Sequence, residues 1–344
     1  MRLVAAALIG AALLAACEAP AQRLDEQRLL AMGTWVDIAI QTDDRPAADA
    51  AISTAQQMLR GFERDYYPWA DGELARVNRA IAAGRAVHAD PSLARLLARA
   101  KRLSALSDGT FDPGIGSLIR MWGFNSDPNR SRKPPAPAAI AAWLRDRPTI
   151  ASLHVRADVI SSGQRSVLID LGGIAKGAVV DRIIAQLEAA GFKNALVNAG
   201  GDLRCIGHRN GRRWRIGIQS PRSAGMLGVI DLQSGEAAVT SGDYERFFRY
   251  KGRRMDHIFD PATGYPVEHT RSVTVIAADA ATADAAATAV FVAGPGRWQQ
   301  VARAMGIDAV LRVDASGKVQ ITRKMRERLQ KVTVKESDII VVDS

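Results

Sequence analysis

The stretch from Ser166 to Arg204 most restricts the fold of this 344-residue chain. A β-rich run at 166–171 meets a turn at Gly172-Gly173, and an apolar pattern of helical period leads to a short strand at 195–198. This order predicts a strand, a glycine loop, a helix and a strand. Glycines let backbone amides approach a ligand, a helix start favours negative charge, and Lys176 adds a positive charge. An oxygen-rich anion such as a diphosphate would therefore fit at this loop.

A second glycine pair, Gly200-Gly201, follows the second predicted strand. We expect it at the same edge of the sheet, where ligands of α/β units usually lie. Each pair could equally make only a tight turn. The first loop is not a P-loop, because no Gly-Lys-Ser/Thr follows it, and it lacks the G-x-G-x-x-G pattern of dinucleotide-binding proteins. The two pairs are thus consistent with an anion site but do not identify its ligand.

Amino-acid composition limits the number of domains and the kinds of partner that this chain can have. About half of the residues are apolar, so the chain can bury the core of one large domain or two coupled domains. The net charge of +10 comes from scattered Lys and Arg without interleaved aromatic residues, which favours anionic partners and excludes nucleic acid as the expected one. The basic run 323–335 is interpreted as a solvated face.

The amino terminus carries a targeting signal. Arg2 precedes an apolar stretch at 3–16 that is too short to span a membrane and ends in Leu-Ala-Ala before Cys17. This end resembles a bacterial lipobox, which implies cleavage before Cys17 and lipidation of its thiol; the alternative is a plain secretory peptide with a chance cysteine. Glu18 weakly favours the outer membrane. We expect a periplasmic, lipid-anchored protein with a signal peptide at 1–16 and a tether at 17–27.

Along the chain, helical and strand patterns mix. Helices are predicted at 46–62, 90–107, 137–146 and 282–293, and strands at 28–40 (interrupted near Gly33), 214–219, 225–232, 236–241, 272–277, 309–313, 319–321 and 339–342.

Three groups of residues are candidates for chemistry. The aromatic corner Tyr67-Pro68-Trp69 could stack a flat heterocycle or could cover a core edge. His257 lies among turn residues and carboxylates, and a lone histidine is often structural. Asp284 and Thr288 lie four residues apart on one helix face and offer the hard oxygen ligands that Mg²⁺ prefers. They could instead serve the helix dipole and a backbone carbonyl.

Taken together, several short motifs resemble the FAD:protein FMN transferase family, also called ApbE. They are Met32-Gly33-Thr34, Phe111-Asp112-Pro113, the segments 170–177, 198–202 and 240–246, HIFDPATGYP at 257–266 and ADAAAT at 283–288. The resemblance spans about 32–294 and implies an α+β fold with curved, largely antiparallel sheets and packed helices, of the T-fold type. It implies a transferase domain at 28–322, leaving a basic segment and a possible edge strand at 323–344.

The resemblance also implies site residues. FAD would contact Met32, Thr110, Phe111, Asp112, Asp170, Lys176, His257 and Ile258. The family's stacking tyrosine has no counterpart at the same spacing here, so Trp69 or Tyr67 would stack the flavin or adenine, and Trp69 is favoured. Mg²⁺ would bind Asp284 and Thr288 with backbone oxygens near Gly173 and Ala281.

The implied reaction moves the FMN part of FAD onto a Thr or Ser hydroxyl of an acceptor protein, as a phosphoester, and releases AMP. Breaking the pyrophosphate requires cations to neutralise phosphate oxygens and a base for the hydroxyl proton. Lys176, the metal held by Asp284, and His257 would fill these catalytic roles. Family acceptors are membrane or periplasmic electron-transfer subunits. Alternatives are a Mg²⁺-dependent FAD pyrophosphatase and a non-catalytic FAD-binding lipoprotein. The proposed enzyme requires the helix with Asp284 to face the Lys176 turn across a pocket wide enough for a flavin nucleotide.

Overall fold

A computed structural model describes residues 23–125 and 132–343. Its centre is a sheet of nine strands in the order β1-β2-β6-β7-β10-β15-β16-β17-β19. Every neighbouring pair is antiparallel except β17 and β19, which are parallel. The bounds are β1 Leu24–Ala31, β2 Thr34–Gln41, β6 Ala195–Ala199, β7 Asp202–Ile206, β10 Ala237–Gly242, β15 Thr270–Ala277, β16 Ala309–Asp314, β17 Val319–Thr322 and β19 Ile339–Val342. The expected α+β fold with largely antiparallel sheets is confirmed.

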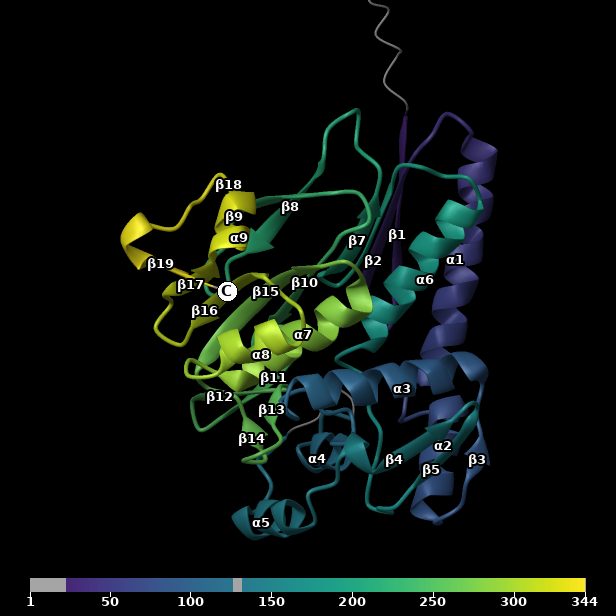
Figure 1. The fold of residues 1–344 in the computed structure, drawn as a ribbon, viewed down its shortest axis with the longest axis vertical. Coiled ribbons are helices and arrows are strands. Elements are labelled where there is room, and N and C mark those ends of the chain that lie inside the picture. Colours follow the sequence, from purple (N-terminus) through teal and green to yellow (C-terminus); the bar gives the residue numbers. More distant parts are fainter. Residues whose placement is uncertain (1–22, 126–131, 344) are drawn as a thin grey trace, which may run out of the picture.

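Helices cover one face of this sheet (Figure 1). Alternate residues of β2, such as Val36, Ile38 and Ile40, are fully buried in the same core cluster as α1 (Arg45–Tyr66), α6 (Ala175–Ala189) and α7 (Ala280–Ala293). The alanines of α7 let it pack closely against β10, β15 and α6, and α8 (Trp298–Ala304) lies against α7. The helices that carry Lys176 and Asp284 are therefore fixed on one face of the sheet.

The opposite face carries a second, smaller core. It is covered by the three-stranded sheet of β8 (Trp214–Gln219), β9 (Met226–Leu232) and β18 (Leu329–Gln330), together with α9 (Arg323–Arg328). Met325 of α9 and Leu329 of β18 are buried in this core. The basic run 323–335 is therefore not simply a solvated face, because Met325 and Leu329 point inward and Val332 and Val334 pack against the same core.

A third part flanks the sheet at the lower end of Figure 1. It contains α2 (Glu73–Ala82), α3 (Pro91–Leu106), α4 (Gly116–Met121), α5 (Pro137–Asp146), β3 (Val87–His88), β4 (Leu153–Arg156), β5 (Val159–Ser162) and the short 3₁₀ turn Ile150–Ser152. Two small hairpins complete the fold: β11 (Phe247–Tyr250) with β12 (Arg253–Asp256), and β13 (Phe259–Asp260) with β14 (Tyr265–Pro266). A further 3₁₀ turn, Glu336–Asp338, precedes β19.

The predicted strand at 166–171 is wrong. Only Leu168 pairs with another segment, through an isolated bridge to Ile115. The backbone is satisfied by a side chain instead, because Asn78 donates to Ile169 O at 2.9 Å and accepts from Ile169 N at 2.8 Å. The predicted α/β unit is replaced by an extended segment, a helix and the antiparallel hairpin β6–β7.

Two further boundaries differ from the sequence prediction. The single interrupted strand at 28–40 is the hairpin β1–β2, turned at Met32-Gly33. Its first strand begins at Leu24, which pairs with Gln41, so the last residues of the segment assigned to the tether belong to the sheet. None of the helices within 23–125 and 132–343 combines the length and apolar character needed to cross a bilayer.

Candidate functional site

Two hairpin turns meet at one end of the sheet. Met32-Gly33 joins β1 to β2, and Gly200-Gly201 joins β6 to β7; all four residues have positive φ, as two-residue hairpin loops require. The Gly200 amide donates to Trp35 O at 3.1 Å, and a Cβ at Gly200 would lie only 2.4 Å from Thr34 Oγ1. The two predicted motifs therefore converge, although Gly200-Gly201 is a hairpin turn and not the end of a parallel strand.

The start of α6 packs directly on α7. A Cβ at Gly177 would lie 2.2 Å from Ala280 O, so only glycine permits this approach. The Gly177 amide donates to Asp284 Oδ2 at 3.3 Å. Asp284 therefore supplies a partner to a first-turn amide of α6, which has no side-chain cap of its own. The expectation that Lys176 and Asp284 come together is met, but the two helices touch and leave no flavin-sized gap between them.

A charged cluster forms around Lys176. Its Nζ lies 2.6 Å from Asp202 Oδ1, and Asp202 is completely buried. Burial alone would lower the pKa of Lys176, but the charges of Asp202 and Asp284 outweigh it and raise that pKa. Burial and the nearby Asp202 charge raise the pKa of Asp284 well above its ordinary value. The sequence reading missed Asp202 as a site residue, although an acid directly after a glycine turn was visible in the motif at 198–202.

Oxygen atoms suited to a hard cation gather beside this cluster. Thr288 Oγ1 lies 3.5 Å from Ser241 Oγ and 3.2 Å from the position that a Cβ on Gly173 would take. The second oxygen of Asp202, Oδ2, is buried without a hydrogen-bond partner among the described residues. No group of three His, Cys, Asp or Glu side chains suited to a metal occurs within 23–125 and 132–343. A cation here would rely on Asp284, Thr288 and backbone or substrate oxygens, which is the donor set that Mg²⁺ accepts.

Ala281 lies beside the start of α6, because a Cβ on Gly177 would be 2.8 Å from its Cα, and the Gly177 amide donates to Asp284. The Ala281 amide donates to Asp181 Oδ2 at 3.0 Å, in a network that also holds Arg204. Ala281 precedes Thr288 by seven residues, which is about 10 Å along a helix. The structure therefore places Thr288 beside Gly173 and Ala281 close to the Gly177 amide that contacts Asp284.

His257 is held by the backbone of Arg246. Its Nδ1 lies 3.1 Å from Arg246 O, and its amide donates to the same oxygen at 3.2 Å. A carbonyl only accepts, so Nδ1 carries the hydrogen and Nε2 is the basic nitrogen. Burial and the Arg246 charge lower the pKa of His257 to about 3. The imidazole is therefore neutral, with no proton on Nε2. The next residue, Ile258, is buried, and its amide donates to Asp256.

Trp69 reaches the site through Asp170, whose carboxylate accepts a hydrogen bond from the Trp69 side chain. Asp170 Oδ1 accepts from Gly172 N at 2.7 Å. Burial raises the pKa of Asp170, while hydrogen bonds from Gly172 and the Trp69 side chain and the Arg246 charge counteract the shift. Tyr67 is 46% exposed at the surface. Of the two candidate stacking residues, Trp69 is the one connected to the glycine loop.

The loop at 110–112 is braced internally. Thr110 Oγ1 donates to Ser107 O at 2.9 Å. The Asp112 carboxylate accepts from the Gly114 amide at 2.7 Å, from the Ile150 amide at 2.9 Å and from the Thr149 hydroxyl. Its side chain therefore fixes the loop. Phe111 is buried against Gly173, where a Cβ would lie 3.4 Å from its ring.

A cleft of about 490 Å³ opens beside the two hairpin turns, between the sheet and strand β8. Thr34, Gly201, Tyr244 and Glu245 are among the residues that line it. Glu245 connects the cleft to the charged cluster, because it interacts electrostatically with Lys176 and Asp202, and burial raises its pKa. The cleft lies on the β8 side of the sheet, and neither Lys176 nor Asp284 is among the residues that line it.

Comparisons with known proteins agree on one family. The profile of the ApbE family matches residues 32–311. The FAD:protein FMN transferase of Rhodobacter capsulatus is 38% identical over 333 residues, covering 96% of this chain, and this chain spans 62% of that relative's length. The FAD:protein FMN transferase of Klebsiella pneumoniae is 31% identical over 321 residues, covering 88% of this chain and 90% of the relative.

Solved structures give the same result. The ApbE protein of Thermotoga maritima superposes with a TM-score of 0.83 at 31% identity, covering 90% of this chain and 100% of that chain. The apo form of the Pseudomonas stutzeri flavinyl transferase ApbE has a TM-score of 0.79 at 29% identity, covering 90% and 97%.

Proposed function

Because the chain belongs to the ApbE family, we propose that it is an FAD:protein FMN transferase. The hydroxyl oxygen of a Thr or Ser in an acceptor protein attacks the FMN phosphorus of FAD, a phosphoester bond forms, and the bond to AMP breaks. The observation that carries the proposal is the convergence of Lys176, Asp202, Asp284 and Thr288 beside two hairpin turns. These groups form a charged, oxygen-rich site on the helix-covered face of the sheet, next to the turn that Asp202 follows.

The charge and position of each residue determine its role in the reaction. Lys176 keeps its positive charge and stabilises negative charge that develops on a phosphate oxygen. Neutral His257 accepts the acceptor's hydroxyl proton at Nε2. Asp284 and Thr288, with a backbone oxygen near Gly173, would hold Mg²⁺. When bound, the ion neutralises the diphosphate oxygens.

Different residues contact FAD and the acceptor protein. Trp69 stacks on a flat ring of FAD, while the segments at Met32, 110–112 and 257–258 line its path. The acceptor is a membrane or periplasmic electron-transfer subunit with an accessible Thr or Ser. This assignment follows from the family resemblance and the proposed location of the chain.

Mass spectrometry of acceptor proteins after incubation with FAD and Mg²⁺ tests the reaction. We expect FMN on a hydroxyl residue and one AMP per transfer. His257→Ala should reduce transfer about 10²- to 10⁴-fold with FAD still bound, whereas His208→Ala, at an exposed histidine, should not change it. AMP that accumulates without acceptor would indicate a pyrophosphatase. Bound flavin without AMP under any condition would indicate a storage protein.

The metal assignment has a readout independent of activity. Mg²⁺ at 100 times its Kd should stabilise the folded protein by about 2.7 kcal/mol, because it binds the folded state. Melting curves with Mg²⁺ and with NaCl at matched ionic strength measure this shift. Asp284→Asn and Thr288→Val should each abolish the Mg²⁺-specific part. An equal shift in the wild type and both variants would refute the assignment.

For its location, we propose a lipid anchor at Cys17 that holds the chain at the periplasmic face of a bacterial membrane, with the outer membrane favoured by Glu18. Cys17 lies outside the described residues. Mass spectrometry of the amino-terminal peptide should find an acylated Cys17, and Cys17→Ala should move the protein to the soluble fraction. An unmodified Cys17 in the mature protein would refute the anchor.

A further inference from the structure

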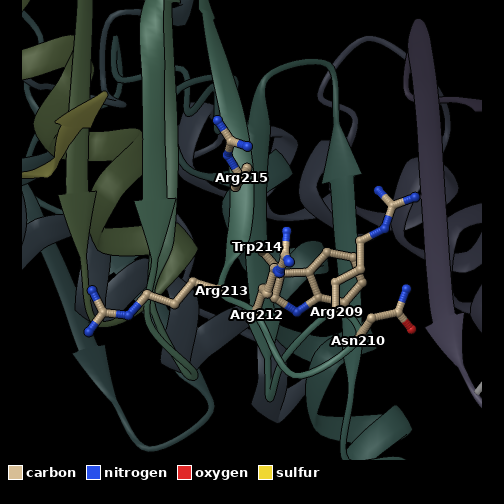
Figure 2. A pocket seen from close by; sticks show the side chains of 6 residues that line it. All are labelled: Arg209, Asn210, Arg212, Arg213, Trp214 and Arg215. Atoms are coloured by element: carbon tan, nitrogen blue, oxygen red, sulfur yellow. The ribbon is translucent and has the colours of Figure 1, made fainter. Parts of the chain in front are cut away.

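The loop between β7 and β8 carries a dense group of arginines. Arg209, Arg212 and Arg213, with Arg215 at the start of β8, surround a hollow of about 450 Å³ (Figure 2). All four are exposed, whereas Trp214 between them is buried and donates from Nε1 to Ile206 O at 3.1 Å. This group, called the arginine loop below, is held in place by its tryptophan.

Few carboxylates lie close enough to neutralise the positive charge of the arginine loop. Arg209 has only a distant carboxylate, Glu26, at 3.9 Å, and Arg215 lies 3.7 Å from Asp231. Arg212 and Arg213 have no ion-pair partner within the part of the chain that the structure describes. These two guanidinium groups are free to bind an anion from outside the molecule.

Hydrogen bonds fix the arginine loop at the end of the sheet where β1 begins. The Asn210 amide donates to Gln41 Oε1 at 2.8 Å, and Gln41 Nε2 donates to Asn210 Oδ1 at 2.9 Å. Gln41 pairs with Leu24, the first residue of β1. Figure 1 shows the β7–β8 loop and the start of β1 at the same end of the molecule.

The distance to the proposed anchor is short. Residues 18–23 separate Cys17 from Leu24, and a segment of that length cannot extend beyond about 25 Å. A lipid on Cys17 therefore keeps this end of the sheet close to the bilayer. The turns Met32-Gly33 and Gly200-Gly201, with the charged cluster, lie at the opposite end of the same strands.

The guanidinium groups point in different directions. Figure 2 shows Arg209, Arg213 and Arg215 spreading away from one another and not converging on one point. A single small anion would need convergent donors, whereas a surface with many separate negative charges suits this arrangement. We infer that the arginine loop binds the phosphates of anionic phospholipid headgroups in the membrane to which Cys17 is attached. The inference rests on the proposed anchor and fixes the orientation of the sheet relative to that membrane.

Vesicle sedimentation of the unlipidated chain separates the arginine loop from the anchor. The chain from position 17 with Cys17→Ser retains every described helix and strand, since the first begins at Leu24. We expect it to bind vesicles of phosphatidylglycerol and phosphatidylethanolamine at low salt and to bind phosphatidylcholine vesicles poorly. Each basic residue near an anionic surface contributes about fivefold in affinity, so Arg212→Gln with Arg213→Gln should weaken binding about 25-fold.

The matched control removes the same charge elsewhere. Arg95 and Arg102 are exposed on α3, away from the arginine loop. Arg95→Gln with Arg102→Gln should leave most of the vesicle binding, and melting curves should show both double variants folded. Equal losses in the two variants, no loss in the arginine-loop variant, or equal binding to phosphatidylcholine would overturn the inference. So would a wild-type chain that binds an acidic protein but no anionic vesicle.

Discussion

Replacing Lys176 by Met tests whether the buried charges of the site depend on one cation. The side chain keeps its length but loses its charge, and Asp202, which is completely buried and 2.6 Å from Lys176 Nζ, loses its partner. Asp284 also loses the positive charge that opposes the rise of its pKa. Two buried carboxyl groups are then left beside each other without a counter-charge.

Breaking a buried ion pair by removing one partner costs about 3–5 kcal/mol. For a folded chain of roughly 320 residues the unfolding entropy is about 0.7 kcal/mol/K, so the melting temperature should fall by about 4–8 °C. The deficit should grow with pH. Without Lys176 the folded-state pKa of Asp284 rises further above its unfolded value, so the stability that depends on its protonation is present at low pH and lost as pH rises.

The assay is urea unfolding at pH 5 and pH 8, with FMN transfer measured in parallel. Lys324→Met removes an exposed Lys–Asp pair and should leave stability almost unchanged, because water screens that pair. Adding Asp202→Asn to Lys176→Met should restore part of the stability, because the uncompensated charge is removed. Transfer should stay low in both variants, about 10²- to 10³-fold below the wild type. A Lys176→Met protein as stable as the wild type at pH 8 would refute the reasoning.

Three further outcomes follow from the geometry and can be measured on the purified protein. Gly200→Ala places a Cβ 2.4 Å from a hydroxyl of the neighbouring turn at φ +61°, whereas Gly211→Ala at φ +73° meets nothing within 4 Å. Chemical unfolding should therefore show the first costing about 1–3 kcal/mol more than the second. Burial raises the pKa of Asp256 to about 8, so its contribution to stability is lost as pH rises from about 4 to about 8. Asp256→Asn should flatten that decline, and an unchanged pH profile would contradict it. Trp69→Leu should weaken FAD binding, followed by fluorescence, about tenfold, whereas exposed Tyr67→Leu should leave it unchanged.

Local signals in the sequence predicted the bounds of some helices, whereas α2, α4, α8 and α9 were not predicted. α5 begins at Pro137 and ends at Asp146 as predicted, and α3 begins at Pro91 because Asp90 accepts from the Ser92 and Leu93 amides. Capping and proline positions depend on residues only a few places apart, so they can be read without the fold.

Non-local contacts explain what the sequence could not predict. The strand pattern at 166–171 was misleading because Asn78, about 90 residues earlier, satisfies the Ile169 backbone. Asp202 was missed because its importance comes from burial under α6 and α7, which no local pattern reports. The family motifs placed Lys176 and Asp284 together correctly. They gave no indication that the helices touch and that the accessible space lies beside the hairpin turns.

The strands themselves connect the two proposals. The eight residues of β1 rise about 3.3 Å each, so roughly 25 Å separates the end that carries the arginine loop from the Met32-Gly33 turn. If that end rests on lipid headgroups, the charged cluster faces the periplasm at about this height. An acceptor hydroxyl must then be presented well above the bilayer surface or on a segment that can extend to it. The same sheet that aligns Lys176 with Asp284 would thus select acceptors by the distance of their target residue from the membrane.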